Sequence, residues 1–263
     1  MAFEARPTIR LESVRTLIRY VDEDQAILEV HVTLRRPLPI VPRRSPGATG
    51  GLGLLIELHS NEGFHDEHLV PLHLRHRRGT FRMQVVQPSR WWPAGMGEQP
   101  LYDLTASLLV DDAIVDQHQH TVGFTSVRPD DESQLVEQQQ VLLVNGRRFE
   151  VEAIVAVDRI DENSLLPAAG DTLIMVRDHY GPDLLNEAAD RAGIMLIQCV
   201  PIHPEGRPEV EVPAQVCRLA SHPSLAGWFI DHHGDVSRRI AQRLRRLDPT
   251  HSLIGGTTDR SAA

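Results

Sequence analysis

The spacing of apolar residues changes near residue 130, and this change restricts the chain to a few fold types. Up to about residue 128, apolar and polar residues alternate, as in strands with one buried face. One such run would bury five side chains on the same face: Ala26, Leu28, Val30, Val32 and Leu34. Similar runs occur at residues 81–85 and 102–108, and turn residues separate them. The pattern predicts an antiparallel β-sandwich, with an exposed loop at residues 37–51, which are rich in Pro, Gly and Arg.

Beyond residue 130, short apolar segments alternate with helical patterns, which is typical of a parallel sheet with covered faces. The expected strands are residues 151–157, 173–176, 194–200, 225–230 and 252–255. The expected helices run from Asp183 to Ala192, from Pro213 through Leu219, and from Asp235 through Leu247. The arginines of the last helix should face solvent. We therefore expect a β-sandwich domain at residues 1–130 and an α/β domain at residues 131–263.

Charge and cysteine content narrow the possible partners. The net charge of −9 provides no excess of positive charge for phosphate backbones, so we expect no nucleic-acid partner. The two cysteines, Cys199 and Cys217, are too few for a disulfide scaffold, and no signal peptide or membrane-spanning stretch is evident. These features predict a soluble cytoplasmic protein. The sequence has neither a Gly-rich phosphate loop nor a Gly-x-Ser-x-Gly motif, and we expect no cofactor.

Six segments in fixed order carry a recognisable pattern. Residues 90–102 read RWWPAGMGEQPLY, 122–128 VGFTSVR, 143–149 LVNGRRF, 158–167 DRIDENSLLP, 222–228 HPSLAGW and 247–250 LDPT. In this order they resemble glycoside hydrolase family 2, of the β-mannosidase and β-galactosidase type. The resemblance implies an immunoglobulin-like β-sandwich followed by a TIM-barrel region, and a role in carbohydrate metabolism.

The resemblance stops before the family's barrel is complete. A full (β/α)₈ barrel takes about 200 residues or more, whereas fewer remain here and the matches end at the fifth strand. The helix between the first two strands and the family's N-terminal sugar-binding domain also find no counterpart. We expect an incomplete (β/α)₈ barrel of about five strands. Its open edges predict a homo-oligomer or a protein partner that covers them.

Retaining glycoside hydrolysis needs two carboxyl groups about 5 to 5.5 Å apart. The resemblance places His232 at the position of a family asparagine and His233 at the acid/base glutamate, while the nucleophile belongs to a seventh strand. This implies a catalytically inactive protein that serves as a binding or assembly module. Two alternatives remain: a fragment of a larger glycosidase, or an active glycosidase with an altered site. The candidates for an altered catalytic site are Asp178, Asp231, His233 and Asp235.

Other side chains at the expected strand ends are candidates for carbohydrate binding. They are Arg177, His179, Tyr180, Trp228 and His232. Histidine and aspartate side chains can also bind divalent metals. With 14 histidines in the chain, however, chance clusters are common, and we expect a polar rim without a metal ion. Trp91 and Trp92 are expected to pack in the core rather than to stack on sugars.

Overall fold

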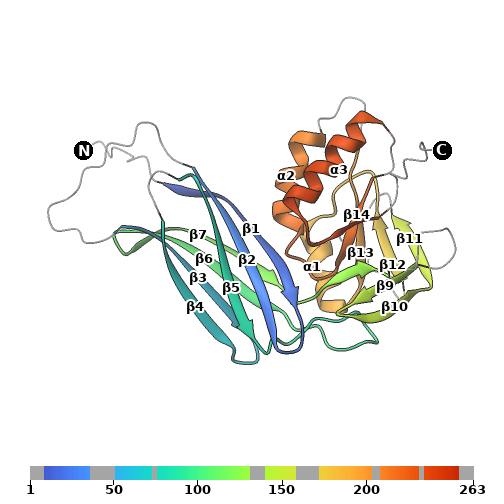
Figure 1. The fold of residues 1–263 in the computed structure, drawn as a ribbon, viewed down its shortest axis with the longest axis horizontal. Helices are drawn as coiled ribbons and strands as arrows, with labels where there is room; N and C mark the ends of the chain where they lie inside the picture. The colour runs from blue at the N-terminus through green and yellow to red at the C-terminus, as the bar shows by residue number, and fades with distance from the viewer. Residues whose placement is uncertain are drawn as a thin grey trace.

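The computed structural model describes residues 9–35, 51–72, 76–130, 140–157, 172–202, 208–230 and 234–254. Two antiparallel sheets form the N-terminal part, and a parallel sheet with helices forms the C-terminal part beside them (Figure 1). The predicted order of a sandwich followed by an α/β region is confirmed. Most of the loop expected at residues 37–51, and the deletion expected between the first two barrel strands, lie outside the described residues.

The sandwich consists of a three-stranded and a four-stranded sheet. The first has the order β1 (Arg10–Val21), β2 (Gln25–Arg35), β5 (Arg78–Val86). The second has the order β4 (His65–Leu72), β3 (Leu52–Ser60), β6 (Tyr102–Val110), β7 (Ala113–Val122). The predicted alternation in β2 is confirmed, because all five expected core side chains are at most 3% exposed. Four of them pack against β3 and β6 in the main sandwich core, and Leu34 packs against the same two strands in a smaller cluster.

A small antiparallel sheet connects the two parts. Its order is β10 (Arg147–Val151), β9 (Gln140–Val144), β8 (Val127–Pro129). Side chains of this sheet share one hydrophobic cluster with Trp91, Trp92 and the parallel sheet. Trp91 is fully buried and Trp92 is 9% exposed, so the prediction that both pack in the core is confirmed.

The parallel sheet follows the chain order without interruption. Its strands are β11 (Ala153–Val157), β12 (Thr172–Val176), β13 (Met195–Cys199), β14 (Leu225–Phe229) and β15 (Ser252–Ile254). Successive side chains of a strand point to opposite faces. In β12, Leu173 therefore packs on the connecting sheet and the tryptophans, whereas Ile174 packs on a helix.

The helices α1 (Asp183–Ala192), α2 (Pro208–Leu219) and α3 (Asp235–Leu247) pack on one face of this sheet (Figure 1). The bounds of α1 and α3 are as predicted, and Gly193 ends α1 with a φ of 71°. The prediction that a helix begins at Pro213 is wrong, because α2 begins at Pro208 and contains Pro213. Pro208 has the φ that a first turn needs, and the burial of Val212 and Val216 offsets the hydrogen bond lost at Pro213. Within the described part of the chain, no helix has the length and hydropathy to span a membrane.

Candidate functional site

Ligand sites of parallel α/β sheets form where the strands end, at their carboxyl edge. In this chain the described part of that edge consists of the turn at residues 177–181 after β12 and the first residues after β13 and β14. Three of the predicted site residues, Arg177, Asp178 and His179, lie together in this turn. The structure thus brings them to the edge where the sequence predicted a site.

The turn has a tight backbone with Asp178 at its tip. The backbone N–H of Arg177 donates to the carbonyl oxygen of Val157 over 3.0 Å, which extends the pairing of β11 and β12 by one residue. The backbone N–H of His179 donates to the Arg177 carbonyl oxygen (2.7 Å), and His179 Nδ1 lies 2.8 Å from the same oxygen. Asp178 lies between them with a φ of 60°, which is unfavourable for a residue with a Cβ atom. The turn therefore holds an exposed carboxylate at the end of β12.

Gln198 of β13, which was not among the residues predicted from the sequence, binds this turn. Its side chain is 3% exposed, and its Oε1 accepts a hydrogen bond from the backbone N–H of Gly181 over 3.1 Å. Its Nε2 donates to the carbonyl oxygens of His179 (2.9 Å) and Cys199 (2.6 Å). The sequence does contain a sign of this role, because Gln198 is a single polar residue within the apolar segment at residues 194–200. Gln198 thus links the ends of β12 and β13 through hydrogen bonds to the backbone of the turn.

Two other predicted residues, Tyr180 and Trp228, pack in the hydrophobic cluster between the helices and the parallel sheet. Tyr180 packs against the cluster formed by α2 and α3, and its hydroxyl is buried without a hydrogen-bond partner. Burial, with a smaller contribution from Glu211, raises the pKa of Tyr180. Trp228 is 1% exposed in the same cluster, and its Nε1 donates to Asp248 Oδ2 over 2.7 Å. Trp228 is therefore closed to a ligand, whereas Tyr180 is only partly buried.

The remaining predicted residues lie near the end of β14. Asp231, His232 and His233 are outside the described residues, and their roles stay predictions. Asp235 is exposed at the start of α3, where it pairs with Arg238, and this contact holds the pKa of Asp235 below its usual value. Within the described ranges, no group of three or more His, Cys, Asp or Glu side chains is arranged to hold a metal ion.

Two of the buried carboxylates that are described, Asp190 and Asp248, lie at the opposite, amino edge of the sheet. Asp190 of α1 is 1% exposed and accepts hydrogen bonds from His222 Nδ1 (2.6 Å) and from the backbone N–H of Ser224 (3.1 Å). Asp248, also 1% exposed, lies 2.8 Å from His251 Nδ1 in addition to its bond with Trp228. Burial alone would raise the pKa of Asp248, but these neighbours outweigh it and hold that pKa well below its usual value. Both aspartates fix the loops that lead into β14 and β15.

Comparison with known sequences relates the chain to glycoside hydrolases. Residues 53–124 match the family described as glycosyl hydrolases family 2. Over 210 residues the chain is 25% identical to an exo-β-D-glucosaminidase of Streptomyces avermitilis. This alignment covers 68% of the present chain and 23% of that enzyme. The chain thus spans less than a quarter of the length of this relative.

Comparison with solved structures supports the same fold. A glycosyl hydrolase family 2 member from Bacteroides cellulosilyticus superposes with a TM-score of 0.67 at 16% identity, over 93% of this chain and 36% of that one. A β-D-mannosidase from Dictyoglomus thermophilum gives a TM-score of 0.67 at 18% identity, over 93% of this chain and 34% of that one. At these identities the likeness concerns the fold alone.

Proposed function

We propose that this chain, which is glycoside hydrolase family 2-like in sequence and fold, does not hydrolyse glycosides but binds carbohydrate or assembles with a protein partner. The resemblance to the family that the six sequence segments predicted is confirmed. The absence of hydrolysis, the ligand and the partner are the proposed part.

The observation that carries the proposal is the sequence Asp231-His232-His233 after β14. By the resemblance, an asparagine and the acid/base glutamate would stand at positions 232 and 233. A histidine cannot be equated with the carboxylic acid that protonates the leaving oxygen in this reaction. Loss of one member of a catalytic unit costs many orders of magnitude in rate. The rate for ordinary glycosides is then expected to be negligible.

The proposed architecture is an immunoglobulin-like domain at residues 1–130 followed by an incomplete (β/α)₈ barrel at residues 131–263. The parallel strands in chain order, with helices on one face, support the barrel relationship. β11 pairs only with β12 among the described strands, and Val155 at this edge is 41% exposed. An apolar edge strand favours a covering partner, such as a second copy of the chain. Light scattering of the purified protein tests this, and a monomer at all concentrations would contradict the assembly role.

The proposed ligand class is a β-linked hexoside. Arg177 and His179 at the end of β12 offer polar contacts for hydroxyl groups. Because the matched relative is an exo-β-D-glucosaminidase, β-D-glucosaminides are the first compounds to examine. No cofactor is proposed, and a cytoplasmic location remains a proposal that rests on the low cysteine content.

A substrate panel and a binding titration test the proposal together. The panel consists of 4-nitrophenyl β-D-mannoside, galactoside, glucuronide, glucoside and glucosaminide, and we expect no release of nitrophenol above the buffer blank. Turnover that is lost in the Asp178→Asn variant would overturn the proposal. Calorimetric titration with glucosamine oligosaccharides is expected to give binding that Arg177→Gln weakens and Arg245→Gln, on the exposed side of α3, leaves unchanged. Absence of both binding and self-association would also overturn it.

A second candidate function is that of one part of a larger, active glycosidase. The length of the relatives favours this candidate, because the match to this chain covers 23% of the sequence relative and about a third of each of the two similar structures. The mass of the native polypeptide in cells distinguishes the two candidates. A species near 29.5 kDa favours the first, and a much larger species favours the second.

A further inference from the structure

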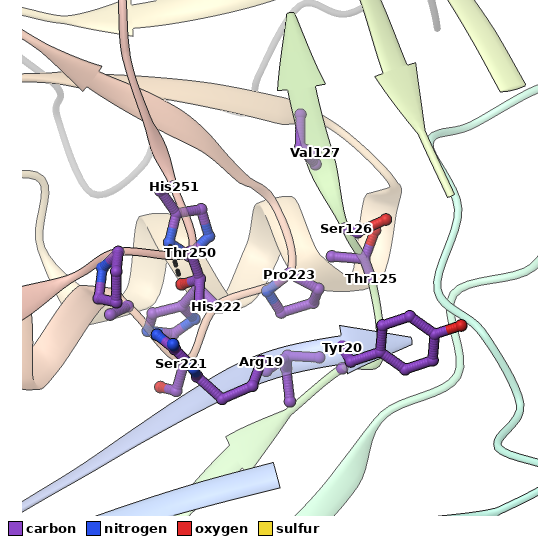
Figure 2. A pocket seen from close by; sticks show the side chains of 14 residues that line it. Arg19, Tyr20, Thr125, Ser126, Val127, Ser221, His222, Pro223, Thr250 and His251 are labelled. Atoms are coloured by element: carbon purple, nitrogen blue, oxygen red, sulfur yellow. Dashed lines mark hydrogen bonds between the residues drawn. The ribbon is translucent and has the colours of Figure 1, made fainter. Parts of the chain in front are cut away.

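A cavity of about 210 Å³ lies at the amino edge of the parallel sheet, away from the turn at residues 177–181 (Figure 2). Its wall comes from four segments: the end of β1, the link between β7 and β8, and the loops that precede β14 and β15. None of the described residues that line the cavity is acidic. The polar lining includes Arg19, Ser126, Ser221, His222, Thr250 and His251.

Two of these residues are histidines held by buried carboxylates. His222 Nδ1 lies 2.6 Å from Asp190 Oδ2, and His251 Nδ1 lies 2.8 Å from Asp248 Oδ2. The side chains of His222 and His251 are only 10% and 11% exposed. With Nδ1–H committed to the carboxylate, Nε2 is the nitrogen that remains for a ligand. Among the described residues, neither Nε2 has a hydrogen-bond partner.

Arg19 adds a fixed positive charge to the cavity. It projects from β1 and forms an ion pair with Glu29, in which Nε lies 3.8 Å from Oε2, but among the described residues its guanidinium group makes no hydrogen bond. Its guanidinium group is therefore able to bind an oxyanion in the planar, bidentate manner typical of arginine.

The volume of the cavity and the polar groups of its lining indicate which kind of ligand fits. The volume is below the roughly 300 to 1,000 Å³ of ordinary small-molecule sites, so a small ion fits better than a sugar chain. We propose that this junction cavity, defined by Arg19, His222 and His251, binds hydrogen phosphate. Its oxygens accept from the guanidinium group and from the hydroxyl groups of Ser126 and Ser221. Its O–H can donate to an imidazole Nε2. Sulfate lacks that proton at neutral pH and satisfies the site less well.

The test is calorimetric titration of the whole chain with inorganic phosphate at constant ionic strength, which keeps charge screening fixed. We expect saturable binding with one site per chain, and weaker binding of sulfate. Arg19→Gln should weaken phosphate binding by about tenfold or more, because a charge-assisted contact is lost. Arg82→Gln is the matched control: Arg82 binds the same Glu29, with a 2.8 Å hydrogen bond, but does not line the cavity. Its affinity should stay within about twofold of the unmodified chain.

Several results would overturn this assignment. They are no phosphate binding at 10 mM, equal binding of sulfate, or equal effects of the two arginine variants. The Arg19 variant is preferred to histidine variants because His222 and His251 are bonded to buried aspartates and their loss could unfold the chain. The thermal midpoint of each variant without phosphate, compared with that of the unmodified chain, separates lost binding from lost folding.

Discussion

Replacement of Asp190 by leucine should destabilise the fold strongly, because this carboxylate serves two buried donors. His222 Nδ1 and the backbone N–H of Ser224 both bond to it, and Ser224 is fully buried. Leucine has a similar size but accepts no hydrogen bond. Each donor left without a partner costs about 1–3 kcal/mol. Two such donors, one of them the Nδ1–H of a nearly buried histidine, give an expected loss of about 3–5 kcal/mol in the free energy of unfolding.

Urea denaturation followed by circular dichroism measures this loss as a lower midpoint with an unchanged slope. The total stability of a domain is about 5–15 kcal/mol, so the leucine variant would be only marginally folded. Asp190→Asn keeps one acceptor oxygen and should lose about 1–2 kcal/mol, which keeps it measurable. Asp183→Ala in the same helix is the control, because Asp183 is exposed and makes a surface ion pair with Arg218. That variant should lose less than about 1 kcal/mol. A loss in Asp190→Leu no larger than in this control would refute the reasoning.

Three further variants test other parts of the fold. Gly193→Ala should lower the free energy of unfolding, measured by urea denaturation, by about 2 kcal/mol or more. The reasons are that φ of Gly193 is 71° and that a Cβ atom there would lie 2.5 Å from the backbone nitrogen of Ala94. An unchanged free energy of unfolding would contradict this close approach. Burial of the His120 ring lowers its pKa to about 3. Between about pH 6.5 and pH 3 the His120 side chain therefore binds a proton in the unfolded chain but not in the folded one. The free energy of unfolding should then fall as the pH is lowered through this range, by at most about 1.4 kcal/mol per pH unit. His120→Gln should make this pH dependence shallower, and an unchanged slope would exclude His120 as its source. Gln198→Leu should accelerate hydrogen exchange in the turn at residues 177–181 and leave α3 unchanged; equal protection of the turn in both proteins would argue against its dependence on Gln198.

The sequence predicted the parts of the fold that depend on local apolar patterns. The alternation at residues 26–34 identified the inward face of β2, and the apolar segments after residue 150 located the strands of the parallel sheet. Pro213 misled the helix prediction, because a proline within a helix is tolerated when the apolar residues around it are buried. The local sequence pattern cannot show that burial of apolar side chains offsets the hydrogen bond lost at Pro213.

The site was less predictable because it depends on contacts between distant residues. The sequence could predict that Arg177 and His179 lie close together, because they are two positions apart in the chain. It could not predict the burial of Tyr180 and Trp228, because that depends on the packing of α2 and α3. Asp248 was quoted only as part of the LDPT segment, and its bonds with Trp228 and His251 became evident from the structure. Spacing alone does not show whether a polar side chain faces a ligand or a buried partner.

The indole of Trp91 donates to the carbonyl oxygen of Asp190, a residue 99 positions later in the chain. Trp91 lies in the N-terminal part, yet it fills the hydrophobic cluster beneath the parallel sheet. Contacts between such distant residues slow folding, because a long loop must close before they form. This shared cluster can therefore form only when both parts are folded and in contact. The two parts should then melt in calorimetry as a single cooperative transition, and removal of either should expose core side chains of the other.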